Sequence, residues 1–471
     1  MNRTARLTLL GRVLATLPLA ACVDRPTATT TLAAPDLSAA ALNPLAGNGI
    51  TTTTPALVRT LAAGRGITAM PAPVHVRPEL ARLGQALTFD PILSGNRNIS
   101  CGTCHLPAFG TGDGKSLSIG QGGVDVGPSR SHPQGTFIPR NAPPLFNLSA
   151  MKHLFWDGRI ASNGRGDFNT PAGTQISPTM KRVFEFGAIS AIGMFPVTNR
   201  AEMRGGSGNN EVADVDDADM TGIWSALMAR LGAIPEYRDM FEKAYPGTKF
   251  SDMTFAHASN AIGGFVIDAY SLANSPWDQF LAGNDYALTS KQLEGAKTFL
   301  TLKCSLCHNG AALSDDQFHN VAVAQVGPGE GNGDGGRDDF GRMNVTGNPA
   351  DRYRFRTTPL RNVELTAPYG HDGSIISLKG FVEHYSESDL KLLAFDPFEL
   401  EPALRNTVRS NRAAIIAARD TIILGVVIPP DLVNQLMDYM TALTDDAARD
   451  LRHTIPDRVP SRLAIDRPRG S

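Results

Sequence analysis

The sequence predicts a mainly α-helical fold, built from two similar modules with long irregular loops. Apolar residues fall at helical spacing ahead of two Cys-x-x-Cys-His strings, which begin at residues 101 and 304. Glycine-rich and proline-rich stretches follow each string. No long alternation of apolar and polar residues, the pattern typical of strands, occurs in the chain.

Composition is that of an ordinary globular protein. The 471 residues include 42% hydrophobic and 19% charged residues, with a net charge of -2. This length is comfortable for two domains that each bury a cofactor. A near-neutral charge indicates neither a nucleic acid nor an acidic surface as partner, so we expect no nucleic-acid binding.

The two strings are Cys101-Gly-Thr-Cys104-His105 and Cys304-Ser-Leu-Cys307-His308. In this spacing two thiols can bond to one haem while the next residue offers its imidazole to the iron. A zinc site would use the four thiols but would not need a histidine directly after each pair. A redox dithiol is the other alternative. We therefore expect two covalently bound haem c groups.

The N-terminus has the features of a bacterial export signal. Arginines flank an apolar run that ends in Leu19-Ala20-Ala21-Cys22, which is typical of a lipoprotein signal peptide spanning 1–22. Acylation of Cys22 would tether the mature protein to a membrane by lipid. The alternative is an ordinary signal peptide with an incidental cysteine. Both predict the periplasm, the first with a lipid anchor.

In chain order, residues 23–77 are rich in Thr, Ala and Pro and predict a flexible tether. A helix is expected around Leu80–Leu87, before the first string. The glycine-rich stretch Gly110–Gly127 predicts a loop that wraps a cofactor. From Ile223 to Leu281 the pattern is mostly helical, and Trp224, Leu227, Met228 and Leu231 form one apolar stripe.

The second half repeats this order weakly. A helix over Ser290–Leu302 leads into Cys304, and a second glycine-rich loop spans Gly327–Gly336. Further helices are expected over Leu378–Tyr385 and Leu432–Leu443.

Several strings around the two motifs together resemble the bacterial dihaem cytochrome c peroxidase and MauG family. They are Leu83-Gly84-Gln85-Ala86-Leu87-Thr88-Phe89-Asp90, Ser94-Gly95-Asn96, Arg140-Asn141-Ala142-Pro143, Phe155-Trp156-Asp157-Gly158-Arg159 and Leu365 to Gly373. The resemblance implies two cytochrome-c-like haem domains with a calcium ion between them. We expect the peroxidatic haem domain over 78–285, the electron-transfer haem domain over 286–450 and a tail over 451–471.

The resemblance also assigns roles to residues. His105 resembles the proximal ligand of the peroxidatic haem iron and His308 that of the electron-transfer haem iron. Trp156 matches the tryptophan between the haems, although it could be a core aromatic. Glu202 resembles the acid/base carboxylate above the peroxidatic iron, although a solvated surface position is usual for Glu.

The calcium site implied by the resemblance consists of the Asn141 side chain and the main-chain oxygens of Thr366 and Pro368. Water would supply the remaining oxygens that this ion prefers. Asn141 could instead cap a turn.

Two departures from the family pattern bear on mechanism. Where the peroxidases have a methionine as sixth ligand of the second haem, this sequence has Tyr385, as the MauG branch does. A phenolate favours oxidised iron and lowers its potential, whereas a thioether raises it. His384 is a rival ligand. On the distal side of the first haem, His132 and Gln121 both compete for the place of the detachable histidine.

The resemblance implies a peroxidase that reduces hydrogen peroxide with electrons from a small donor protein, a c-type cytochrome or cupredoxin. One alternative is a MauG-like oxidase that acts through a high-valent haem state on a protein or organic substrate. The other is a dihaem electron carrier. Glu202 favours the peroxidase, and Tyr385 favours the MauG-like branch.

Overall fold

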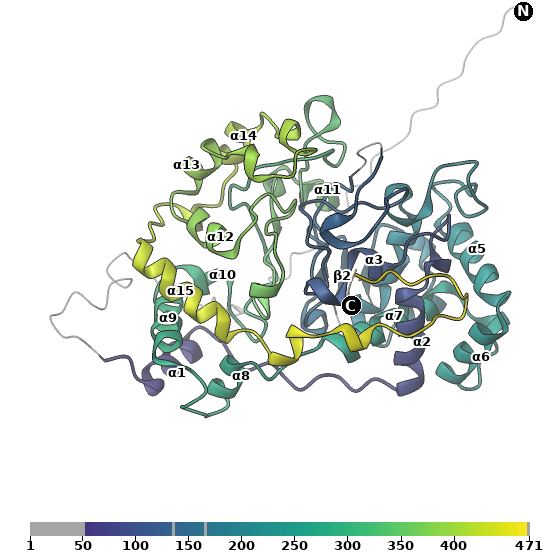
Figure 1. Cartoon of the computed structure of the whole chain (residues 1–471), viewed down its shortest axis with the longest axis horizontal. Helices are drawn as coiled ribbons and strands as arrows, with labels where there is room; N and C mark the ends of the chain where they lie inside the picture. Colours follow the sequence, from purple (N-terminus) through teal and green to yellow (C-terminus); the bar gives the residue numbers. More distant parts are fainter. Residues whose placement is uncertain (1–51, 134–136, 164–166, 469–471) are drawn as a thin grey trace, which may run out of the picture. The chain divides into compact units, whose positions relative to one another are not determined.

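The computed structural model describes residues 52–133, 137–163 and 167–468 (Figure 1). The predicted signal peptide and Cys22 lie outside this part of the chain. The described residues form a mainly helical structure with long loops, which confirms the predicted fold class. The α-helices are α1 (Pro55–Gly64), α2 (Pro78–Phe89), α3 (Cys101–Cys104), α4 (Pro178–Lys181), α5 (Met220–Gly232), α6 (Pro235–Ala244), α7 (Phe255–Tyr270), α8 (Pro276–Leu281), α9 (Ser290–Thr301), α10 (Cys304–Cys307), α11 (Met343–Thr346), α12 (Leu378–His384), α13 (Ser388–Leu393), α14 (Arg412–Ala417) and α15 (Pro430–Ala442).

Two small antiparallel sheets hold the loops between the helices. The strands are β1 (His153–Leu154), β2 (Ile160–Ser162), β3 (Phe168–Asn169), β4 (Phe318–His319) and β5 (Phe355–Arg356). Leu154 lies opposite Ile160, so the residues between them, Trp156 included, form the turn of a hairpin. His319 lies opposite Phe355 in the second sheet.

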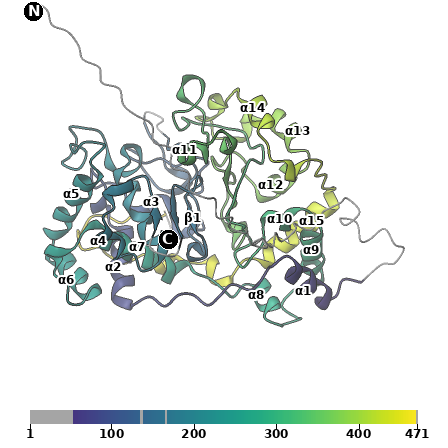
Figure 2. The ribbon, with the colours of Figure 1, turned by 180° about the vertical axis from the view of Figure 1, so that it is seen from behind.

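The same helix crossing occurs beside both cysteine motifs. Helix α2 packs on α7 and helix α9 packs on α15, as the two opposite views show (Figures 1 and 2). Each crossing is centred on a glycine: a Cβ atom at Gly84 would overlap the Ala261 backbone oxygen, and one at Gly295 would overlap that of Gln435. Only a residue without a side chain allows these close approaches. The weak sequence repeat thus corresponds to a repeated packing arrangement.

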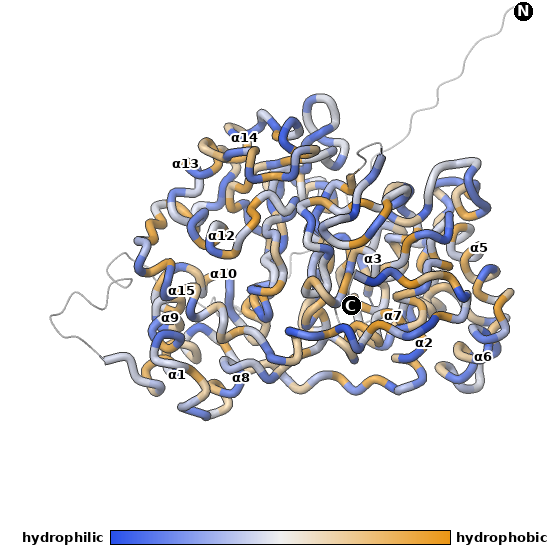
Figure 3. The backbone as a smooth tube through the Cα atoms, in the orientation of Figure 1, coloured by the Kyte–Doolittle hydropathy of each residue, from blue (hydrophilic) through white to orange (hydrophobic). Residues whose placement is uncertain are grey.

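Each crossing lies in its own apolar core. In the first core α7 is buried along nearly its whole length, and Figure 3 shows its apolar character. The predicted stripe of α5 is buried there too. The second core contains residues of α8, α9 and α15, with Trp277 and Tyr439 fully buried.

Helix α1 belongs to the second core. Val58 and Ala62 are fully buried, and α1 packs against α9. The Thr54 hydroxyl accepts a hydrogen bond from the Leu57 N–H and so caps this helix. The expectation of a flexible tether over 23–77 therefore does not hold for α1. The composition of that stretch obscured a short amphipathic segment that is stabilised by tertiary contacts.

The C-terminal segment also packs, beside the first motif rather than the second. Thr454 accepts a hydrogen bond from Gln85 at 2.8 Å, and the Ser461 hydroxyl donates one to Asp90 at 2.6 Å. Farther along, the Thr103 hydroxyl donates a hydrogen bond to Asp466. Figure 1 shows this segment in yellow, running from α15 towards α2 and α3. Residues 451–468 thus connect the two halves of the chain.

Gly84→Ala tests the first helix crossing. Alanine favours helix by about 1 kcal/mol over glycine, but overlap with the Ala261 backbone costs about 1–3 kcal/mol or more. We expect a net loss in the free energy of unfolding, measured by urea denaturation. Gly64→Ala is the control, because no heavy atom lies within 4 Å of a Cβ atom there. Unchanged stability of Gly84→Ala would contradict the close approach.

Candidate active site

The first cysteine motif forms a single helical turn that presents His105. Ser100 and Thr103 form a capping box around α3, and the His105 N–H donates to the Cys101 oxygen at 3.0 Å. The His105 Nδ1–H donates to the Thr111 oxygen at 3.0 Å. This bond fixes the tautomer and leaves Nε2 as a lone-pair donor for a metal.

The second motif repeats this geometry. The His308 N–H donates to the Cys304 oxygen at 2.9 Å, and its Nδ1–H donates to the Leu313 oxygen at 3.0 Å. Burial lowers the pKa of both histidines, which keeps their rings neutral, as a ligand of iron must be.

The thiols fit haem attachment better than zinc or redox chemistry. All four are free, and burial raises the pKa of Cys101 to about 11 and that of Cys304 to about 12. Redox-active cysteines instead have depressed pKa values. Cys101 and Cys104 pack against one core and Cys304 against the other, so the four do not share one ion. The residues present therefore fit one haem c at each motif.

Glu202 lies on the side of the first motif. It belongs to a single turn of π-helix, Arg200–Arg204, and the Asn199 side chain accepts hydrogen bonds from the Ala201 and Glu202 N–H groups. Burial raises the pKa of Glu202 to about 7, with Glu330 adding to the rise and Arg159 opposing it. Its carboxylate contributes, after burial, to the raised pKa values of Cys101 and Cys104. The side chain of Glu202 is partly buried.

Gln121 holds the backbone on both sides of Glu202. Its N–H donates to the Ala201 oxygen at 3.0 Å, and its Nε2 donates to the Met203 oxygen at 2.6 Å. The neighbouring Gly120 approaches this turn so closely that a Cβ atom would overlap the Ala201 oxygen. His132 is partly buried and its ring packs against Gly122. Gln121, one of the two residues that the sequence left open, thus bonds directly to the Glu202 turn.

Trp156 links the two halves of the chain. Its indole Nε1 donates to the Asn141 oxygen at 2.9 Å, and its own oxygen accepts from the Arg356 N–H at 2.8 Å. The side chain is 9% exposed. The ring is thus fixed between the loop at Asn141 and strand β5.

Of the three residues expected to bind calcium, Pro368 lines a cavity, whereas Asn141 and Thr366 are not among its lining residues. The Asn141 Nδ2 donates to the oxygens of Lys115 and Ser116, so its Oδ1 faces the other way. Lys115, Ser116, Ala367 and Pro368 line a cavity of about 300 Å³. Thr366 is partly buried.

At the second motif, Tyr385 and His384 have different surroundings. Burial raises the pKa of Tyr385 well above its usual range, and Cys307 and Cys304 add to this shift. Tyr385 and Cys304 both pack against the second core. The His384 Nε2–H donates to the Val321 oxygen at 2.8 Å, which leaves Nδ1 as a lone-pair donor. His384 therefore stays a rival ligand.

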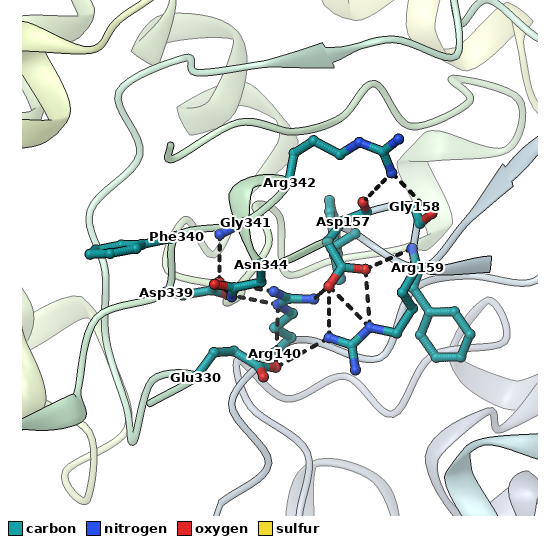
Figure 4. A network of polar contacts seen from close by, with 12 residues as sticks. Arg140, Asp157, Gly158, Arg159, Glu330, Asp339, Phe340, Gly341, Arg342 and Asn344 are labelled. Atoms are coloured by element: carbon teal, nitrogen blue, oxygen red, sulfur yellow. Dashed lines mark hydrogen bonds and ion pairs between the residues drawn. The ribbon is translucent and has the colours of Figure 1, made fainter. Parts of the chain in front are cut away.

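A buried network of charges joins the Trp156 turn to the second half (Figure 4). Arg140 donates to Asp157 at 2.7 Å and to both oxygens of Asp339 at 2.7 and 2.9 Å. Arg159 pairs with Asp157 at 2.8 Å and reaches Glu330 at 3.5 Å. Burial alone would raise the pKa of Asp157, but Arg140 and Arg159 hold it well below its usual range.

Sequence reasoning singled out the strings containing Arg140, Asp157 and Arg159 but missed their partners. Glu330 lies in the predicted second glycine-rich loop, and Asp339 follows that loop. Nothing in the neighbouring sequence distinguishes either residue from a solvated acid. Their charge next to the Trp156 turn arises only from the tertiary fold.

Comparisons with known proteins agree with this site. A family model for di-haem cytochrome c peroxidases matches residues 78–286. The chain is 32% identical to cytochrome c551 peroxidase of Pseudomonas aeruginosa, over 67% of this chain and 75% of that protein. It is 28% identical to methylamine utilization protein MauG of Methylorubrum extorquens, over 72% of this chain and 80% of that protein.

Solved structures share the fold. A MauG-like protein associated with microbial copper homeostasis superposes with a TM-score of 0.57 at 24% identity, covering 83% of this chain and 96% of that one. The diheme peroxidase BthA from Burkholderia thailandensis superposes with a TM-score of 0.56 at 18% identity, covering 84% of this chain and 91% of that one.

The fold and the two motifs define a protein with two c-type haem modules. More particularly, the chain belongs to the di-haem cytochrome c peroxidase family, which implies two haem c groups. In the part of the chain that the structure covers, no helix has the length and apolar character needed to cross a bilayer.

Arg140→Met tests the buried network. It leaves Asp339 buried without its cation, which we expect to lower the free energy of unfolding by about 3–5 kcal/mol. Adding Asp339→Asn should recover part of this loss, because the uncompensated charge is then removed as well. Urea denaturation at pH 7 measures both, with the exposed Arg182→Met as control. Equal stability of the single variant and the control would contradict the network.

Proposed function

We propose that this chain is a peroxidase that reduces hydrogen peroxide to water with electrons from a small c-type cytochrome or cupredoxin. The observation that carries the proposal is Glu202, a carboxyl group beside the first motif with a pKa of about 7. Relatives at about 30% identity are named cytochrome c551 peroxidases, in agreement with it.

Each peroxide takes up two electrons and two protons and yields two water molecules. The haem held by Cys101, Cys104 and His105 would supply the redox-active iron that binds peroxide. Glu202 would accept the proton of the inner peroxide oxygen and return it to the outer one, since a group with a pKa near 7 both takes and gives protons at neutral pH. Gln121 would fix the backbone of that turn.

The remaining residues would supply and position the electrons. Cys304, Cys307 and His308 would hold the electron-transfer haem, and Trp156, bonded to Asn141 and Arg356, would lie on the route between the haems. A calcium ion on Asn141, Thr366 and Pro368 would stabilise the same junction. His132 stays an alternative distal group of the first haem.

We further propose a domain order of 78–285, peroxidatic, and 286–450, electron-transfer. Export by the predicted signal over 1–22 and acylation of Cys22 would give a periplasmic protein anchored by lipid.

One observation favours a second candidate function, a MauG-like oxidase. The Tyr385 side chain packs against the second core together with Cys304, and an anionic oxygen there would stabilise oxidised iron. Such a protein would hold oxidising equivalents long enough to act on a protein or organic substrate. Stoichiometric peroxide without a donor tests this candidate: a long-lived absorbance change supports the oxidase, and immediate bleaching speaks against it.

Glu202→Gln tests the peroxidase. We expect turnover to fall about 10²- to 10⁴-fold, with unchanged haem absorption, because only the proton-transfer group is lost. In the wild type the rate should fall as pH drops through about 7, since the protonated carboxyl cannot accept a proton. This fall of the rate at low pH should be absent from Glu202→Gln. The exposed Glu79→Gln is the control, and undiminished turnover by Glu202→Gln would remove Glu202 from the mechanism.

Tyr385→Met tests the sixth ligand of the second haem. Exchanging a phenolate for a thioether should raise the potential of that haem and make turnover depend on prior reduction. Spectroelectrochemistry measures the potential. In Tyr385→Phe, a second haem with the wild-type absorption and potential would show that another group, first of all His384, is the ligand.

A further inference from the structure

Arg356 is a buried cation whose charge the protein leaves uncompensated. Its side chain is 4% exposed. The Nε donates to the Phe155 oxygen at 3.2 Å, and one terminal nitrogen makes a long contact of 3.5 Å with the Thr357 oxygen. No carboxylate among the described residues forms an ion pair with it. Burial accordingly lowers the pKa of Arg356 to about 10, with only Asp316 acting in the opposite direction.

Four of the other buried arginines of the described chain are paired with carboxylates, and a fifth, Arg130, donates to the main-chain oxygens of Ile119, Asp125 and Gly120 at 2.6 to 2.8 Å. Arg140, Arg204, Arg230 and Arg361 each have a carboxylate oxygen within 3.0 Å. A buried cation without a counter-ion is strongly unfavourable. Arg130 has three main-chain acceptors within 2.8 Å, whereas Arg356 has one at 3.2 Å and a long contact at 3.5 Å. This difference indicates that Arg356 meets its anion in a ligand.

Nearby carboxylates are already occupied. Asp157 pairs with Arg140, and Asp316 with His153 at 3.0 Å. Asp315 and Asp420 both pair with His319. The titratable groups on the elements around β5 are Arg140, His153, Asp157, Arg159, Asp315, Asp316, His319, Arg342, Arg354, His371 and Asp420.

Arg356 lies at the junction of the two cofactor sites. Its N–H donates to the Trp156 oxygen at 2.8 Å, on the side of the first module. Strand β5 pairs with β4, whose His319 bonds Asp315, and the Asp315 N–H donates to the Cys307 oxygen at 2.7 Å. Strand β5 therefore lies between the tryptophan turn and the loop after the second motif, and the Arg356 guanidinium contacts the tryptophan turn at the Phe155 oxygen.

We propose that Arg356 binds a propionate of one of the two haems. Haem carries two carboxylates, and the planar fork of a guanidinium matches that geometry. The bond would neutralise the buried charge and fix the haem edge next to Trp156. This inference rests on the presence of haem c and is independent of peroxide turnover.

Arg356→Gln in the full haem-loaded chain tests the pairing, since glutamine keeps a donor for the Phe155 oxygen and removes only the charge. Spectroelectrochemical titration of each haem from pH 5 to 8 is the measurement. Without the guanidinium the propionate takes up a proton on reduction. One haem should therefore have a midpoint potential that falls with rising pH more steeply than in the wild type. Arg356→Lys should restore the wild-type slope.

Arg352→Gln is the matched control, because it removes the same charge from the same segment. Arg352 lies 4.0 Å from the Phe340 ring centroid and donates to the Tyr353 hydroxyl. The haem whose midpoint potential becomes more dependent on pH is the one whose propionate Arg356 binds. Wild-type slopes for both haems in Arg356→Gln, or the same change in Arg352→Gln, would overturn the proposal. Neither measurement of the midpoint potentials depends on peroxidase activity.

Discussion

The constraint on which the rest of the structure depends is the burial of the Arg140 guanidinium. Carboxylates on more than one side compensate its charge, and Asp157 and Asp339 come from different halves of the chain. Because both halves bind the same guanidinium, this ion-pair cluster holds the Trp156 turn next to the loop before Asp339. The same turn contributes Arg159, which influences the pKa of Glu202. One ionic cluster thus connects the junction of the halves with the candidate proton-transfer group.

The two cysteine motifs have the same local geometry and different surroundings. Each forms a single helical turn after a helix that crosses a partner at a glycine, and each histidine donates its Nδ1–H to a carbonyl. Beside the first lies a carboxyl group with a pKa near neutrality, and beside the second lies a phenol. Equal scaffolds can therefore support proton transfer at one site and stabilisation of oxidised iron at the other.

Likeness to both cytochrome c551 peroxidases and MauG leaves the branch of the family open, since the identities are similar. The choice depends on few atoms. If the side chain at position 385 is the proposed ligand, it would decide between a hard anionic oxygen and a soft thioether on the iron. In the proposed peroxidase, position 202 would decide whether peroxide cleavage has a proton carrier. Local chemistry, more than overall identity, therefore governs activity.

The sequence by itself determined the helical class, the two haem motifs and the main helices. These follow from local rules: the spacing of thiols and imidazole, and apolar residues that recur every three to four positions. Only the tertiary structure decided that α1 packs in the second core and that residues 451–468 return to the first motif. The partners of Arg140 and the uncompensated charge of Arg356 also appeared only there. Such features depend on contacts between segments up to hundreds of residues apart, and no local pattern encodes which distant carboxylate a buried cation will meet.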